Sequence, residues 1–307
     1  MMKLASNCGF GLVQGVGMAA IALLLLTPAA ALAGKVFPTP DAAADAFTAA
    51  IGKPEAMAEL LGADWQQFIP TEGINDEHVQ KYMEGWAKRH EVLPDPFDAE
   101  SGRMVVAVGE GGWTLPIPLV KSDAGWSFDV QAGAEEMKTR RVGRNELAAI
   151  SAVYAYVQAQ REYALEDRDG DGYLEYAQRI ISTPGLEDGL YWAALDDEPD
   201  SPLGPLFGED KPGSDYHGYL FKVLKAQGPA ARGGAHDYVV NGNMRGGFAL
   251  IAWPVEYDDT GVMSFMVNRD GLVYEADLGP ETEALARKLE AFDPGGDWKP
   301  LDPTEAD

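Results

Sequence analysis

Apolar positions follow helical spacing in the first part of the chain. Thr39, Pro40 and Asp41 form a helix start, in which Thr39 is expected to cap the helix and Pro40 to occupy its first position. Apolar side chains then recur every three or four residues: Ala43, Ala46, Phe47, Ala50 and Ile51. The same reading predicts a second, short helix over residues 54–61 and a third near residues 77–89.

Short apolar runs replace this pattern after Pro94-Asp95-Pro96. Residues 104–108, 115–120 and 126–130 are predicted as strands, and the intervening glycine-containing segments 109–112 and 122–125 as turns. Helices followed by an antiparallel meander indicate an α+β domain. In element order, this arrangement resembles the nuclear-transport-factor-2-like and cystatin-like folds.

The clearest amphipathic helix lies in the middle of the chain. After a charged bridge over residues 135–144, a helix is predicted from Asn145, as its cap, to Glu166. Strands are predicted at 219–226, 237–240, 248–253, 262–267 and 272–276, with a hairpin turn at 268–271 and a short helix at 281–290. The pattern predicts a second α+β domain built on a helix roughly 30 Å long.

The resulting organisation is a signal peptide followed by two domains. Residues 1–33 contain Lys3 as their only charge, an apolar stretch from about Val16 to Leu26, and small residues before a cleavage site near Ala33. We therefore expect export to the periplasm through the general secretion route. The predicted domains are residues 36–137 and 140–300, and residues 301–307 are a polar tail.

Charge and cysteine content exclude several classes of function. The formal net charge is −25, and it becomes −26 once Lys3 is removed with the signal peptide. Such a chain is not expected to bind nucleic acid, and no later stretch is apolar enough to span a membrane. The only cysteine, Cys8, lies in the signal peptide, so disulfides, thiolate metal sites and a cysteine nucleophile are excluded from the exported chain.

The densest run of metal-ligand residue types lies between Glu166 and Glu175. Asp167, Asp169 and Asp171 occupy alternate positions and Gly172 follows them, as in a calcium loop. The Tyr173 carbonyl and Glu175 complete the candidate ligands. Gln178 stands where an EF-hand has its bidentate glutamate, so a looser calcium loop is expected, and the alternative is a polar turn.

Other candidate ligand-binding residues lie outside this loop. Arg140, Arg141 and Arg144 are predicted either to bind a carboxylate or phosphate or to pair with neighbouring acids at the domain junction. Tyr191 and Trp192 are candidates for lining a cleft, and His217 lies among aromatic residues. No cofactor is expected beyond a possible Ca²⁺.

Several longer motifs carry a resemblance to one family. They are Trp113–Lys121, Arg140–Leu147, Gln158–Tyr163, the acidic loop with Glu175–Gln178, Gly189–Trp192, Ser201–Pro205 and Gly246–Pro254. Together they resemble the exported bacterial family catalogued as domain of unknown function 2950, which implies no activity. The second half also resembles pilin-like globular domains. Its long helix lies behind a whole domain, however, so the chain is not expected to form fibres as a pilin does.

Two hypotheses of function follow. In the first, the chain is a non-catalytic periplasmic protein that binds an envelope component or a protein partner. In the second, it is an envelope hydrolase that uses carboxylates in the groove between its domains. The sequence contains no nucleophile or zinc signature, which favours the first hypothesis over the enzyme.

Overall fold

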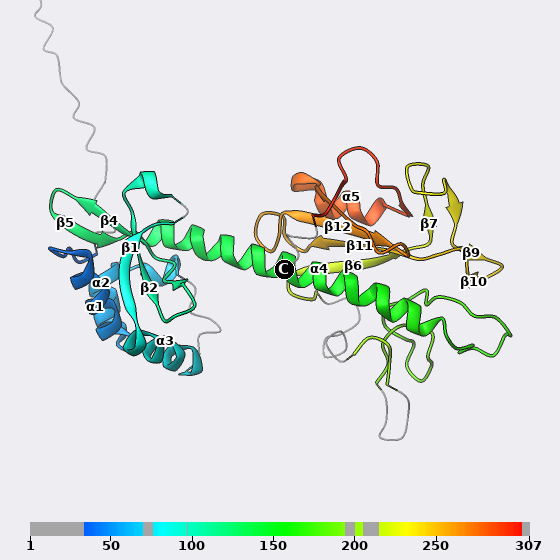
Figure 1. The fold of residues 1–307 in the computed structure, drawn as a ribbon, viewed down its shortest axis with the longest axis horizontal. Helices are drawn as coiled ribbons and strands as arrows, with labels where there is room; N and C mark the ends of the chain where they lie inside the picture. The colour runs from blue at the N-terminus through cyan, green and yellow to red at the C-terminus, as the bar shows by residue number, and fades with distance from the viewer. Residues whose placement is uncertain (1–33, 70–75, 97, 194–199, 205–214, 303–307) are drawn as a thin grey trace, which may run out of the picture.

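The computed structural model describes residues 34–302, apart from 70–75, 97, 194–199 and 205–214. Over this part of the chain the fold is α+β, with five α-helices and several antiparallel sheets (Figure 1). The predicted signal peptide and residues 303–307 of the predicted polar tail lie outside the described residues. No described helix is both long and apolar enough to cross a membrane.

Three helices come first, as the apolar spacing predicts. They are α1 (Pro40–Ala50), α2 (Pro54–Leu61) and α3 (Asp76–Lys88). Thr39 caps α1, because its hydroxyl oxygen accepts a hydrogen bond from the backbone N–H of Ala42 at 3.2 Å. Helices α1 and α2 each bury part of their apolar face, whereas α3 contains no buried residue.

The first sheet has the order β1-β2-β4-β5, and β3 also pairs with β2. Its strands are β1 (His90–Pro94), β2 (Met104–Val108), β3 (Trp113–Thr114), β4 (Leu119–Ser122) and β5 (Gly125–Phe128). The sequence does not predict β1, because the prolines near its end indicate a break. The predicted strand 115–120 is wrong in its first half, because Pro116 and Pro118 have no N–H to donate to a neighbouring strand.

One helix, α4 (Val130–Tyr163), connects the two parts of the chain (Figure 1). The predicted charged bridge over residues 135–144 is therefore wrong. The helix is capped by Asp129, whose carboxylate accepts a hydrogen bond from the N–H of Ala132 at 3.0 Å, and not by Asn145. The spacing of apolar residues does not reveal the first turns of α4. One of their contacts with the core is made by Gly133, and a glycine has no side chain that could add to an apolar pattern. The predicted boundary between residues 137 and 140 lies inside α4.

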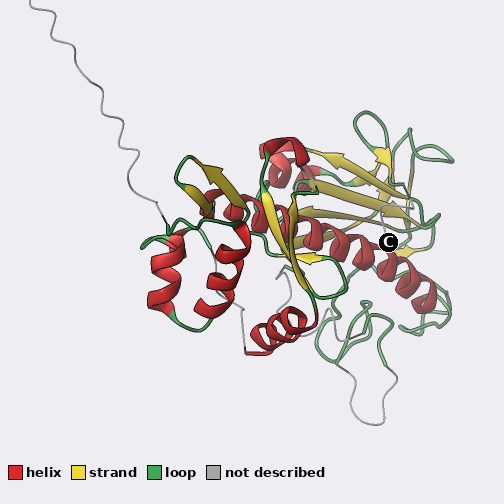
Figure 2. Cartoon of the chain, turned by 60° about the vertical axis from the view of Figure 1, so that its left-hand side comes forward, coloured by secondary structure: helices red, strands yellow, loops and turns green. Residues whose placement is uncertain are grey.

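The second half of α4 lies along a larger antiparallel sheet (Figure 2). The sheet order is β15-β13-β12-β11-β6. Its strands are β6 (Tyr219–Leu224), β11 (Ala249–Pro254), β12 (Met263–Asn268), β13 (Val273–Asp277) and β15 (Lys299–Pro300). The predicted turn joins β12 to β13, where the N–H of Gly271 donates to the carbonyl of Asn268 at 2.9 Å.

Smaller elements complete this half of the molecule. A two-stranded hairpin and a three-stranded sheet flank the large sheet, and a short helix packs on β11. These elements are β9 (Val239–Val240), β10 (Asn243–Met244), β7 (Ala226–Gln227), β8 (His236–Asp237), β14 (Ala291–Phe292) and α5 (Thr282–Lys288).

Buried apolar residues form two clusters, one in each half. The N-terminal core draws on residues 37–130 and the C-terminal core on residues 149–301. Between these cores, residues 134–148 of α4 include no buried residue. Polar contacts hold this stretch to the β11–β12 connection: Lys138 pairs with Asp258 at 2.8 Å, and the side-chain amide of Asn145 donates to the Thr260 carbonyl at 2.9 Å.

Candidate functional site

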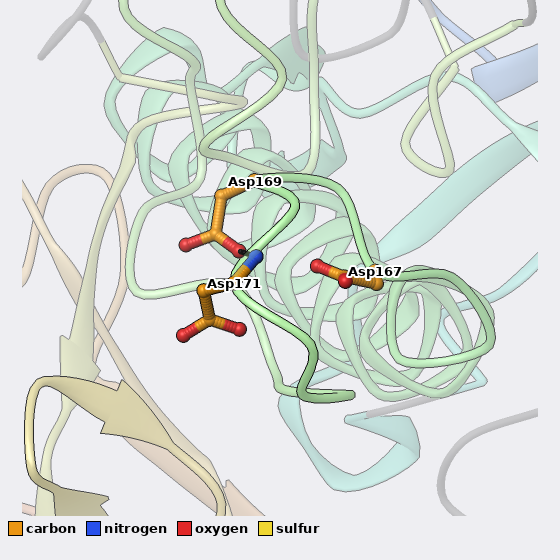
Figure 3. Close-up of side chains that lie close together, drawn as sticks. All are labelled: Asp167, Asp169 and Asp171. Atoms are coloured by element: carbon orange, nitrogen blue, oxygen red, sulfur yellow. Dashed lines mark hydrogen bonds between the residues drawn. The ribbon is translucent and has the colours of Figure 1, made fainter.

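The acidic loop begins four residues after the end of α4. The side chains of Asp167, Asp169 and Asp171 lie close together (Figure 3), and one carboxylate oxygen of each lies within 4.8 Å of the others. Calcium binds oxygen at about 2.3–2.6 Å, so two oxygens on one ion are separated by at most about 5 Å. The three aspartates therefore match the spacing that a shared calcium ion requires.

The shape of the loop depends on Asp167 and on two glycines. One oxygen of Asp167 accepts a hydrogen bond from the N–H of Gly170 at 2.8 Å, and the other accepts from Gly172 at 2.9 Å. Both glycines have positive φ angles, +74° and +90°, which other residues rarely adopt. These bonds turn the backbone around the Asp167 carboxylate, so the alternate aspartates converge.

The β9–β10 hairpin supports the loop from outside. Asp171 accepts a hydrogen bond from the Asn243 side chain, and Glu175 accepts one from the N–H of Met244 at 2.9 Å. Gln178, at the position of the missing EF-hand glutamate, donates to the carbonyl of Gly242 at 2.6 Å. Gln178 thus fastens the loop to the hairpin and does not occupy the place of a metal ligand.

Glu175 and Tyr173 lie at the margin of the group. Burial raises the pKa of Glu175; the hydrogen bond from Met244 opposes this increase, and the charges of the three aspartates add to it. Its carboxylate is not among the oxygens that converge within 4.8 Å. The Tyr173 side chain is half exposed, and the guanidinium of Arg245 lies 4.3 Å from its ring centre.

Arg168 is a buried cation inside the acidic loop that the sequence reasoning missed. Only 8% of its side chain is exposed. It pairs with Glu187 at 2.9 Å, and its guanidinium lies 5.2 Å and 5.0 Å from the ring centres of Tyr163 and Trp192. In the sequence, the feature that could have indicated this role is the position of a basic residue between acidic neighbours. Arg168 balances part of the negative charge and anchors the loop against the end of α4.

Gln160 fixes the chain where it leaves the loop. This side chain is fully buried in the last turn of α4. Its amide nitrogen donates to the Ala177 carbonyl at 2.8 Å and to the Tyr156 hydroxyl at 3.0 Å, and its oxygen accepts from the Ala177 N–H at 2.8 Å. Both backbone groups of Ala177 are therefore satisfied by α4.

A polar cavity of 620 Å³ adjoins the loop. The residues that line it include Tyr163, Arg168, Asp169, Glu175, Gln178 and Lys225.

The predicted arginine cluster lies elsewhere, in the first half of α4. Arg140 donates to Glu136 at 2.7 Å and to the carbonyl and hydroxyl oxygens of Thr114 at 2.6 and 2.8 Å. Arg141 pairs with Asp259 on the β11–β12 connection, and Arg144 is exposed. Arg140 and Arg141 therefore connect α4 to the first sheet and to the β11–β12 connection. The prediction that the cluster binds an anion stays untested.

The aromatic candidates do not share one site with the arginines. Tyr191 and Trp192 pack against the C-terminal core, and Trp192 also contacts Arg168. His217 lies in the turn before β6 with a φ of +49°, and its ring meets that of Tyr216 edge-on at 4.4 Å. Of the predicted ligand-binding residues, Trp192 thus contacts the acidic loop, through Arg168.

The comparisons with known proteins place the chain in a family without assigning it an activity. A comparison with curated proteins gave no match. The model of one family matches residues 34–301, which is nearly the whole described chain and confirms the resemblance noted from its motifs. The chain belongs to the family described as "Protein of unknown function (DUF2950)".

Proposed function

We propose that the chain is a non-catalytic exported protein that binds a calcium ion at loop 167–175. The convergence of the Asp167, Asp169 and Asp171 carboxylates within 4.8 Å carries this proposal. The ligands are hard oxygens, which suit calcium. Glu175 and the Tyr173 carbonyl would supply further ligands and water the rest, since calcium takes six to eight oxygen ligands and three carboxylates alone do not fill this number.

The position of the loop favours a structural role for the ion. The loop follows the C-terminal end of α4, where the helix dipole is already negative, and adds three carboxylates there. A divalent cation would remove this repulsion. It would also tighten the contacts that Asp171 and Glu175 make with Asn243 and Met244, and so fasten the end of α4 to the β9–β10 hairpin.

A thermal melt tests the proposal. The chain without its predicted signal peptide, residues 34–307, should melt at a higher temperature in millimolar calcium than in chelator. Calcium at about one hundred times its Kd would add about 2.7 kcal/mol to the free energy of unfolding. Asp169→Ala should abolish the increase.

The control variant is Asp123→Ala, which removes an exposed aspartate from the β4–β5 turn. It should keep the full calcium-dependent increase, because the change in net charge is the same but the loop is intact. Equal melting temperatures in calcium and in chelator would reject the proposal for the wild-type chain.

The wider biological role remains a proposal as well. The signal-peptide pattern supports a periplasmic location. The two separate cores support two domains. In this proposal the first domain is nuclear-transport-factor-2-like or cystatin-like and the second is pilin-like, as their element order suggests. The partner would be an envelope component or another envelope protein.

The alternative function, a carboxylate-dependent envelope hydrolase, needs a pair of carboxylates free to react. In the first half of α4, Glu136 is instead bound to Arg140.

A further inference from the structure

The N-terminal half contains a second candidate site, far along the chain from the acidic loop. A cavity of 410 Å³ lies between α1, α2, α3 and residues 113–117. Its walls include Phe47, Leu61, Trp65, Tyr82, Trp113 and Ile117, and α4 contributes Met137. The volume is within the range of about 300–1,000 Å³ that is typical of small-molecule sites.

The walls of this cavity contain one imidazole, that of His78, and otherwise no acidic or basic side chain among the described residues. None of the described lining residues is Asp, Glu, Lys or Arg, although these types make up 24% of the sequence. The Tyr82 hydroxyl is already hydrogen-bonded to the Thr48 hydroxyl at 2.9 Å. A charged or strongly polar group placed inside would lose its water and gain few partners, which is unfavourable.

Helix α3 shows that, among the described residues, this space lacks an apolar neighbour. An amphipathic helix normally buries its apolar stripe against a core. In α3 no residue is buried; Val79 and Tyr82 line the cavity and remain partly exposed. Trp113, whose ring meets that of Tyr82 edge-on with 6.0 Å between the ring centres, is 48% exposed. An apolar molecule in the cavity would cover these side chains and complete the packing of α3.

We infer that this cavity binds an uncharged hydrocarbon chain, such as the alkyl chain of a lipid-like molecule, with any polar head group left in water at the rim. Because the described walls contain no Asp, Glu, Lys or Arg, they favour a hydrocarbon chain over a charged ligand. The partly exposed apolar face of α3 supplies the driving force, because its burial removes apolar surface from water. The inference does not depend on calcium binding at the acidic loop.

Displacement of a neutral fluorescent probe tests the inference. N-phenyl-1-naphthylamine should become more fluorescent with residues 34–307, and 1-dodecanol should displace it while 1-butanol does not. Val79→Lys places a charge in the wall and should weaken probe binding at least tenfold. Val79→Trp fills the space and should also weaken binding, and circular dichroism would show that both variants fold.

Met83→Lys is the matched control. Met83 lies one turn further along α3, is 42% exposed and is not a lining residue. This variant should bind the probe within twofold of the wild type. Equal weakening by Val79→Lys and Met83→Lys, or no displacement by 1-dodecanol, would overturn the inference. So would a wild-type dimer that Val79→Lys converts to monomer, because a second copy of the chain would then cover this face.

Discussion

The two ends of α4 lie in opposite chemical environments. Near its start, Met137 lines a mainly apolar cavity, whereas its last residue, Tyr163, lines a polar cavity beside three converging aspartates. The first environment suits a ligand that avoids water, and the second suits a cation. One continuous helix thus joins two candidate sites whose binding would depend on different forces, the hydrophobic effect and electrostatic attraction.

This difference also decides which site the sequence could predict. The three aspartates lie within one five-residue segment, so their alternate spacing alone indicates a calcium loop. The apolar cavity draws its walls from α1, α2, α3, residues 113–117 and α4, and no local pattern brings these segments together. The sequence identified the residues of the acidic loop and missed the cavity.

The fold shows the same dependence on local signals. Helix α2 and strand β2 were predicted with their observed bounds, and α1 with its observed first residue, because proline, a cap or a compact apolar run marks each of them. The sequence did not predict the first half of α4. Residues 134–148 of this helix include no buried residue, and they depend on contacts with Asp258, Asp259 and Thr260, more than one hundred residues later in the chain.

The largest expected effect is at the C-terminal end of α4. Gln160→Leu removes all three hydrogen bonds of this buried amide and leaves the N–H and carbonyl of Ala177 without their partner. We expect a loss of about 3 kcal/mol in the free energy of unfolding, since each buried unsatisfied group costs about 1–3 kcal/mol. Urea denaturation measures it. Gln158→Leu, on an exposed position of the same helix, should change stability by less than about 0.5 kcal/mol; equal losses would contradict the assigned role of Gln160.

Two glycines of α4 test the N-terminal end of the helix. A Cβ at Gly133 would lie 3.0 Å from the Ile117 side chain, whereas one at Gly143 would meet no atom within 4 Å. Gly133→Ala should therefore destabilise the chain by about 1–3 kcal/mol through overpacking. Gly143→Ala should stabilise it by up to about 1 kcal/mol, because alanine is the better helix former. Calorimetric melts that move in the same direction for both variants would disprove this packing.

The smallest expected effect concerns pH at the polar cavity. Burial tends to raise the pKa of Asp188, but hydrogen bonds from the N–H and hydroxyl of Thr183, together with the nearby charge of Arg179, hold this pKa below its usual range. The ionised carboxylate thus contributes stability above the usual aspartate pKa of about 3.9, and this contribution is lost as the pH falls through the lowered folded value. In urea denaturation, wild type should exceed Asp188→Asn in stability at about pH 5, and the difference should shrink in stronger acid. A difference independent of pH would argue against these hydrogen bonds as its cause.

Calcium titration by isothermal calorimetry tests the central claim most directly. The account predicts that residues 34–307 bind one calcium ion per chain, that Asp169→Ala removes this binding, and that Val79→Lys at the apolar cavity leaves it unchanged. Absence of calcium binding by the wild-type chain, or the same binding by Asp169→Ala, would contradict the claim that the end of α4 carries a cation site.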